Sequence, residues 1–205
     1  MKVLITAGPT REKIDAVRFI SNRSTGKMGY ALAAAARDAG CDVTLISGPT
    51  ALADVEGVRM IRVESAAEMA EQVFAVSDDC DAVIMAAAVA DYRPAVHYEN
   101  KMKKTDGPLS LVLERTADIL AGLGKCKKAG QRLIGFAAES EDLIKNAAGK
   151  MQRKNLDWIA GNLVSDGFAT EDNTVILMGK DNSSITIGPA AKAEVARKIV
   201  EVVLK

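Results

Sequence analysis

The sequence predicts an α/β fold: a Rossmann-like, mostly parallel sheet with helices on both faces and a small antiparallel extension. Two observations carry this prediction. Short apolar runs typical of buried strands alternate with amphipathic stretches of helical period. This alternation implies right-handed crossovers between parallel strands. A chain of 205 residues with 48% hydrophobic content can bury one sizeable core, so we expect a single domain over residues 1–205.

The elements follow in order along the chain. The expected strands are the apolar runs at 2–7, 42–47, 81–87, 132–137 and 157–161. The expected helices lie between and after them, near 25–39, 66–76, 116–124, 140–152 and 190–204. The alternation breaks at 95–114 and at 165–188. Within the second break, 174–178 and 184–187 flank a Gly-Lys-Asp-Asn turn, and this pattern predicts a β-hairpin.

Composition and charge exclude several classes of protein. Lysine plus arginine equals aspartate plus glutamate, at 27 each, so no net field draws the chain to nucleic acid or to an anionic membrane. No apolar run reaches the roughly 18–20 residues of a membrane span. The short apolar run directly after Met1-Lys2 is typical of a strand, so we expect no signal peptide. Cys41, Cys80 and Cys126 lack metal-ligand spacing and fit reduced thiols. We therefore expect a cytoplasmic protein.

A polar, glycine-bearing loop runs directly into an alanine-rich helix. The loop contains Ser24, Gly26 and Lys27, and the alanine-rich part of the helix begins at Tyr30. Such a loop offers free main-chain N–H groups and the positive end of a helix dipole, so it predicts a phosphate cradle.

Two familiar phosphate loops do not fit this segment. In a Walker A loop the first position is glycine and a hydroxyl follows the lysine, whereas here these positions are Ser21 and Met28. A dinucleotide-binding loop follows the first strand directly and has an acid at the end of the second strand. Here a long insert separates the first strand from Gly26, and Asp42 lies at the start of the second. We therefore expect no nicotinamide cofactor.

Polar or small residues follow three of the predicted parallel strands. We call the residues at and directly after the carboxyl end of a strand its exit. Ligands of open parallel sheets bind beyond these ends, so the three exits indicate where a site lies. They contribute Gly8 after the first strand, Ala87, Ala88 and Asp91 after the third, and Gly135, Phe136 and Ala137 on the fourth.

The segment after Asp91 carries a cluster of lysines, Lys101, Lys103 and Lys104. Its position beyond a strand exit indicates a flap that brings lysine charge to a phosphate. His97 has no partner for a catalytic triad, and we interpret it as structural.

Taken together and in order, these segments resemble phosphopantothenate-cysteine ligase in its bacterial, CTP-using form. The resemblance covers nearly the whole chain and is specific, because it rests on seven separate motifs, which are 6–12, 17–22, 26–29, 87–92, 101–104, 135–139 and 154–157.

The resemblance implies a two-step reaction. The carboxylate of 4′-phosphopantothenate attacks the α-phosphorus of CTP, pyrophosphate leaves, and the amine of L-cysteine then displaces CMP from the acyl-cytidylate. Both steps need groups that stabilise developing negative charge. Mg²⁺ is expected on the triphosphate, held mainly by phosphate oxygens and water.

The family match also assigns roles to residues. It implies that Lys101 neutralises the α-phosphate during activation and that Asn22 steadies the acyl-cytidylate, since an amide can hydrogen-bond a carbonyl without adding charge. The implied substrate-binding residues are Arg18, Asn22, Ala87 and Ala88. The implied nucleotide-binding residues are Gly8, Ser24, Gly26, Lys27, Asp91, Lys101, Gly135, Phe136 and Ala137.

The resemblance further implies a homodimer, with its contacts expected in the segments 95–114 and 165–188. These 205 residues do not include the flavin-dependent decarboxylase that bacterial members usually carry at the N-terminus, which leaves open both a separately encoded ligase domain and a fused one. Two alternatives belong to other classes of protein. A dinucleotide-dependent reductase is disfavoured by the missing ribose acid and the missing Tyr-x-x-x-Lys pair. A non-catalytic nucleotide-binding module differs from the ligase only in lacking turnover.

Overall fold

A computed structural model describes residues 1–104, 106–139, 143–163 and 172–205 of the chain. Its centre is an eight-stranded sheet with the strand order β12-β11-β10-β9-β6-β1-β4-β5. The parallel strands are β1 (Lys2–Ala7), β4 (Asp42–Ser47), β5 (Arg59–Arg62), β6 (Ala82–Met85), β9 (Arg132–Glu139) and β10 (Trp158–Leu163). The antiparallel strands β11 (Asp172–Gly179) and β12 (Ser184–Ala191) extend one edge. The predicted fold class is confirmed.

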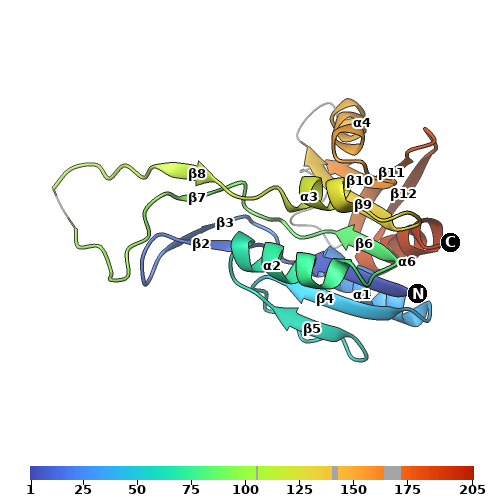
Figure 1. Cartoon of the computed structure of the whole chain (residues 1–205), viewed down its shortest axis with the longest axis horizontal. Coiled ribbons are helices and arrows are strands. Elements are labelled where there is room, and N and C mark those ends of the chain that lie inside the picture. Colours follow the sequence, from blue (N-terminus) through green and yellow to red (C-terminus); the bar gives the residue numbers. More distant parts are fainter. Residues whose placement is uncertain (105, 140–142, 164–171) are drawn as a thin grey trace.

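Helices cover both faces of this sheet (Figure 1). The helices α1 (Lys27–Asp38) and α6 (Lys192–Val203) enclose one apolar core, and α2 (Ala66–Ser77), α3 (Ile119–Cys126) and α4 (Leu143–Arg153) enclose the other. Successive strand residues point to opposite faces, so Ile5 lies in the first core and Leu4 in the second, both with 0% exposure. This two-sided burial explains why the strands are continuous apolar runs rather than alternating ones.

Most predicted elements are present, with shifted ends. The hairpin of the second break is confirmed, because β11 and β12 pair antiparallel. Helix α3 starts at Ile119 rather than 116 because the side chain of Asp118 caps it, accepting a hydrogen bond from the N–H of Ala121 at 3.0 Å. Residues 140–142, at the start of the helix predicted for 140–152, and residues 165–171 of the second break lie outside the described residues.

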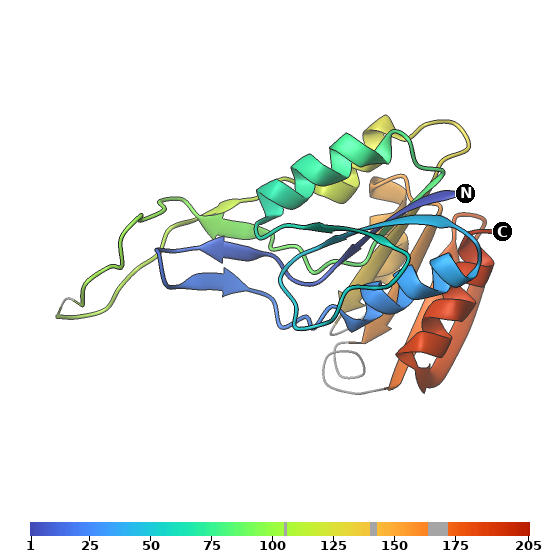
Figure 2. The ribbon, with the colours of Figure 1, turned by 90° about the horizontal axis from the view of Figure 1, so that it is seen from below.

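Sequence reasoning missed the edge strand β5 and four short strands. The short strands form two antiparallel ribbons, β2 (Arg11–Lys13) with β3 (Phe19–Ser21), and β7 (Tyr92–Pro94) with β8 (Leu113–Arg115). Together with the segment between β7 and β8 they form an arm that extends away from the sheet (Figures 1 and 2). The first break, 95–114, is therefore largely the outer part of this arm; residue 105 lies outside the described part.

The strand order predicts a ligand site at the middle of the sheet. From β1 the chain moves outward to β4 and β5 on one side, and from β6 it moves outward to β9 and β10 on the other. Strand order therefore reverses between β1 and β6, and ligands of open α/β sheets bind beyond the carboxyl ends of the strands at such a reversal. Within the described ranges, no helix has the length and apolar character needed to cross a membrane.

Candidate active site

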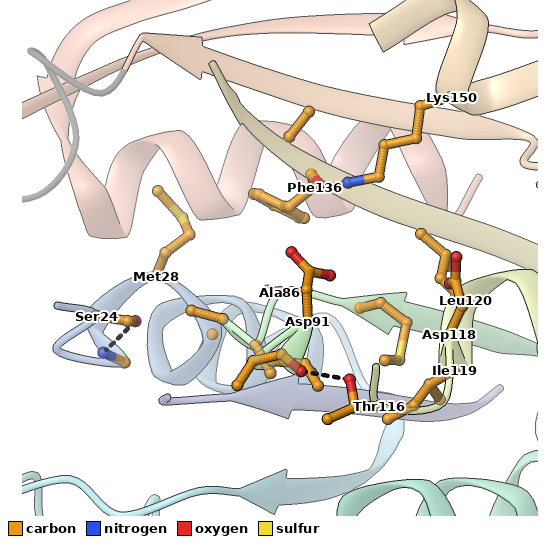
Figure 3. A pocket seen from close by; sticks show the side chains of 18 of the residues that line it. Ser24, Met28, Ala86, Asp91, Thr116, Asp118, Ile119, Leu120, Phe136 and Lys150 are labelled. Carbon is orange, nitrogen blue, oxygen red and sulfur yellow. Dashed lines mark hydrogen bonds between the residues drawn. The ribbon is translucent and has the colours of Figure 1, made fainter. Parts of the chain in front are cut away.

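A cavity of about 590 Å³ lies at this reversal, beyond the carboxyl ends of β6 and β9 (Figure 3). Its wall combines the loop before α1, the exit of β6, the start of α3 and the end of β9. Five further side chains reach it from α4, the turn after α4, β10, β11 and α6, namely Lys150, Lys154, Asn162, Asn173 and Lys192. The volume is in the range of small-molecule sites.

The loop at 24–29 forms one end of the cavity. Gly26 is the N-cap of α1 and adopts φ 80°, a left-handed conformation that glycine tolerates. No side chain caps α1, and its first turn holds no acidic residue. The first N–H groups of a helix lack main-chain acceptors, so this end of α1 offers donors and a positive dipole to an anion.

The exit of β6 is held in place by hydroxyl and amide side chains of the N-terminal segment. Thr6 Oγ1 accepts the N–H of Ala87 at 3.2 Å, and Thr10 Oγ1 accepts the N–H of Ala90 at 3.0 Å. Asn22 Nδ2 donates to the carbonyl of Ala88 at 3.0 Å. These contacts fix a run of small residues at the cavity wall, where a ligand can approach the main chain closely.

The lining is rich in positive charge. It contains five cationic side chains, Lys27, Arg115, Lys150, Lys154 and Lys192, and two carboxylates, those of Asp91 and Asp118. In Figure 3 the carboxylate of Asp91 projects into the space beneath Phe136. Such an environment suits a polyanion with a polar, hydroxyl-bearing part.

The far end of the cavity is lined by Lys150 on α4 and by Lys154, the residue directly after this helix. Lys150 Nζ donates to the carbonyl of Phe136 at 2.7 Å (Figure 3). Lys154 Nζ forms an ion pair of 2.8 Å with Asp118, the N-cap of α3. The pKa of Asp118 is lowered: burial alone would raise it, but the hydrogen bond and charge of Lys154 and the N–H of Ala121 outweigh that effect.

Eight of the predicted site residues line the cavity: Ser24, Gly26, Lys27, Ala87, Ala88, Asp91, Phe136 and Ala137. Gly8 and Gly135 lie behind its wall. A Cβ on Gly8 would meet Thr50 Cγ2 at 2.9 Å, and one on Gly135 would meet Leu156 Cδ1 at 2.8 Å. Both glycines therefore allow close packing that supports the site.

The remaining predicted residues lie outside the lining. Asn22 holds the β6 exit through Ala88. Arg18 and Lys101 belong to the arm, where Arg18 contacts Asp15 and Lys101 is exposed. The structure thus brings together the cradle, the β6 exit and the β9 residues, but not the two cationic residues of the arm.

Several lining residues escaped sequence reasoning. Lys150 and Lys154 carried a usable signal, because Lys150 falls in the helix predicted for 140–152 and Lys154 begins the motif at 154–157. Lys192 and Asn173 carried none, since they reach the cavity only through the pairing of β11 with β12. Asn173 is 6% exposed, and its Oδ1 has no hydrogen-bond partner in the described part of the chain. A buried acceptor of this kind is normally satisfied by ligand or water.

Among the described residues, no group of three or more His, Cys, Asp or Glu side chains comes together that could hold a metal ion. The lining does offer oxygen atoms that suit Mg²⁺, the carboxylate of Asp91 and the unpartnered Oδ1 of Asn173. The residues therefore fit an ion that arrives with a phosphate ligand rather than one held by a protein cage.

Comparison with known proteins identifies the family of the chain. Residues 1–205 match the family model of the DNA/pantothenate metabolism flavoprotein C-terminal domain. The chain belongs to this family. It is 48% identical over 203 residues to the coenzyme A biosynthesis bifunctional protein CoaBC of Bacillus subtilis strain 168, a match that covers 97% of this chain and 50% of that protein. The chain thus spans about half the length of this relative.

Two solved structures have the same fold. The crystal structure of the C-terminal domain of CoaBC superposes with a TM-score of 0.85 at 44% identity, covering 98% of this chain and 92% of that one. The Cab2 mutant H337A, solved in complex with phosphopantothenate-cysteine, superposes with a TM-score of 0.83 at 18% identity, covering 99% of this chain and 85% of that one. The latter comparison shows the fold alone.

Proposed function

We propose that this domain is a phosphopantothenate-cysteine ligase that uses CTP. It would join 4′-phosphopantothenate to L-cysteine through an acyl-cytidylate and release CMP and pyrophosphate. The observation that carries the proposal is the cavity at the strand reversal, which combines the uncapped N-terminus of α1 with five cationic side chains. These features match a triphosphate-bearing co-substrate. The family membership supports the same reaction class.

The nucleoside would occupy the end of the cavity between Phe136 and the start of α3. Phe136 supplies an aromatic surface, and its main-chain carbonyl, which accepts the hydrogen bond from Lys150, lies beside it. The carboxylate of Asp91 can accept hydrogen bonds from sugar hydroxyls. Lys150 and Lys154 add positive charge at this end, although each already has a protein partner.

The triphosphate would extend toward the loop at 24–29. The N–H groups of the first turn of α1 and the side chain of Lys27 would bind its oxygens there. Mg²⁺, when bound, neutralises part of the triphosphate charge and eases departure of pyrophosphate. Asp91 and Asn173 are the oxygen-bearing side chains that would face it or its water ligands.

In the first step the carboxylate of phosphopantothenate attacks the α-phosphorus and the bond to pyrophosphate breaks. Lys101 would neutralise the charge that develops on the α-phosphate, which requires the arm to bring it to the cavity. In the second step the amine of cysteine attacks the acyl carbon and CMP leaves. Asn22, fixed at the β6 exit through Ala88, would steady the acyl-cytidylate beside the small residues Ala87 and Ala88. Arg18 would contribute to phosphopantothenate binding.

The arm would also join two copies of the chain in a homodimer. It carries a set of exposed apolar side chains, among them Val17, Val96, Leu109 and Val112 at 57–74% exposure. Apolar side chains gathered on an extended arm are typical of interfaces. We further propose that the protein acts in the cytoplasm, where its cysteines would stay reduced.

The half-reaction tests this function. Protein, CTP, Mg²⁺ and phosphopantothenate are mixed without cysteine, and pyrophosphate is measured; Lys101→Gln is the matched variant. We expect release of about one pyrophosphate per site from the parent chain and none from the variant, with unchanged circular dichroism since Lys101 is exposed. Nucleotide binding without release would indicate a non-catalytic module, and substrate reduction in a separate assay with a nicotinamide cofactor would indicate a reductase.

A further inference from the structure

The segment that carries Lys101 is fastened to the turn between β2 and β3 by a buried carboxylate. This carboxylate belongs to Asp15, whose side chain is 0% exposed. The main-chain N–H of Met102, the residue directly after Lys101, donates to Asp15 Oδ2 at 3.1 Å. A residue far away in the sequence therefore holds the main chain beside the flap lysine.

Arg18 completes this attachment. Its Nε donates to Asp15 Oδ2 at 3.0 Å, and one Nη contacts the same oxygen. The same Nη donates to the carbonyl of Met102 at 3.3 Å. Both polar main-chain atoms of Met102 are thus engaged. We call the side chains of Asp15 and Arg18 with the main chain of Met102 the clasp.

Further hydrogen bonds fix the carboxylate of Asp15 within the clasp. The second oxygen of Asp15, Oδ1, accepts the N–H groups of Val17 and Arg18, each at 2.9 Å, so the carboxylate has a fixed orientation. The hydrogen bond from Arg18, followed by those from the main chain, keeps the pKa of Asp15 well below its ordinary value. The carboxylate therefore remains charged at neutral pH.

We propose that Asp15 is a positioning residue for the ligation: through the clasp it fixes the point from which Lys101 reaches the α-phosphate. The clasp binds main-chain atoms one residue from Lys101, so it restricts the lysine's own main chain while leaving its side chain exposed. A charge presented from a fixed point needs less ordering when the substrate reacts. This inference rests on the role proposed above for Lys101.

The same contacts give Arg18 a place in the reaction that does not require it to touch substrate. Its guanidinium faces Asp15 and Met102, and it does not line the cavity. Loss of activity on changing Arg18 would then report the clasp, in addition to any contact with phosphopantothenate.

Two variants break the clasp from opposite sides. Asp15→Asn replaces the acceptor of the Met102 N–H, whereas Met102→Pro removes the N–H itself and leaves the turn of Asp15 and Arg18 unchanged. If the clasp acts through Lys101, each should slow pyrophosphate release by about 10- to 100-fold, with the KM for CTP within about threefold of the parent. The double variant should be no slower than the slower single variant.

Glu114→Gln is the matched control. Glu114 lies on the same arm and pairs with Arg93 at 2.7 Å, but both side chains are about half exposed. It should keep the parent rate. If Met102→Pro also keeps the parent rate of pyrophosphate release while Asp15→Asn is slow, Asp15 acts through its own turn and the proposal is wrong. The same conclusion follows if the rate of the double variant falls by the product of the two single effects. Faster release in either variant would also overturn it.

A second readout does not depend on turnover. Trypsin cuts after Lys103 and Lys104, two bonds that all of these variants retain, and the clasp should slow cleavage there in the folded chain. We expect faster cleavage in Asp15→Asn and Met102→Pro than in the parent or in Glu114→Gln, and equal rates would show that the clasp does not hold the segment. If the parent releases no pyrophosphate, the ligase proposal fails, while faster cleavage in these variants still supports the clasp.

Discussion

The close contact between α1 and β1 sets the position of the phosphate cradle, and Gly29 makes it possible. A Cβ built on Gly29 would lie 2.5 Å from Ala7 Cβ, 2.9 Å from Ala7 Cα and 2.9 Å from the carbonyl oxygen of Thr6. All three atoms belong to the central strand, and none is the flexible end of a side chain. We predict that Gly29→Ala destabilises the domain because α1 must move away from the sheet.

The magnitude follows from two opposing effects. Alanine is favoured over glycine inside a helix by at most about 1 kcal/mol. Forcing a methyl group into a packed contact costs about 1–3 kcal/mol, and the upper value applies because main-chain atoms of β1 are in the way. The net loss is about 2 kcal/mol. For a chain of this length that lowers Tm by about 4–8 °C.

The assay is thermal unfolding followed by circular dichroism, with Gly149→Ala as the matched control. Gly149 also lies in a helix, but the nearest atom to a Cβ placed on it is Arg153 Nη1 at 2.9 Å, the end of a flexible side chain. Gly149→Ala should therefore raise stability, by about 0.5–1 kcal/mol. A Tm shift of the same sign in both variants would refute the reasoning about Gly29.

Three further predictions follow from the site and the core. For Asn22→Asp we expect the first half-reaction to proceed and the second to fail, because a carboxylate repels the phosphate of the intermediate. Mass spectrometry after a quench should then show that acyl-cytidylate accumulates. Normal product formation without this accumulation would remove Asn22 from the mechanism. Because Phe136 limits the space for a purine and a wrong base leaves buried groups unpaired, we expect kcat/KM for CTP to exceed that for ATP by at least ~10-fold, and equal use of both nucleotides would contradict this pocket assignment. Burial would raise the pKa of Asp157, but the hydrogen bonds from Lys180, the N–H of Leu133 and Lys127 lower it. The carboxylate therefore stabilises the fold above its unfolded pKa of about 3.9, and this stabilisation is lost as the pH falls below that value. Asp157→Asn should lower stability at pH 7 by about 1–3 kcal/mol and flatten the acid limb of the stability curve, and an unchanged acid limb would contradict this role of Asp157.

The sequence predicted those parts of the fold that local patterns encode. The strands at 2–7, 42–47 and 132–137 are apolar because both faces of the sheet are covered, and such runs are readable without a structure. The strand β5, with the sequence Arg-Met-Ile-Arg, was missed because an edge strand buries less and this one is short, with a charged residue at each end. The ribbons of the arm are three residues long per strand, too short for any period to appear.

The candidate site was predictable to the extent that it follows strand exits. Gly26, Asp91 and Phe136 were predicted from the loop and the strand exits, and all three line the cavity. Lys192 and Asn173 were not, because an antiparallel extension at the sheet edge returns the chain to the cavity. The clasp was equally hidden, since Asp15 and Met102 lie 87 positions apart and meet through a main-chain N–H.

The route of one oxygen atom tests the central proposal most directly. Phosphopantothenate labelled with ¹⁸O in its carboxylate is turned over with CTP and cysteine, and the nucleotide and phosphate products are analysed by mass spectrometry. Attack of the carboxylate on the α-phosphorus predicts one ¹⁸O atom in CMP and none in pyrophosphate. Label in a phosphate product other than CMP, or product formation with unlabelled CMP, would contradict an acyl-cytidylate and with it the proposed function.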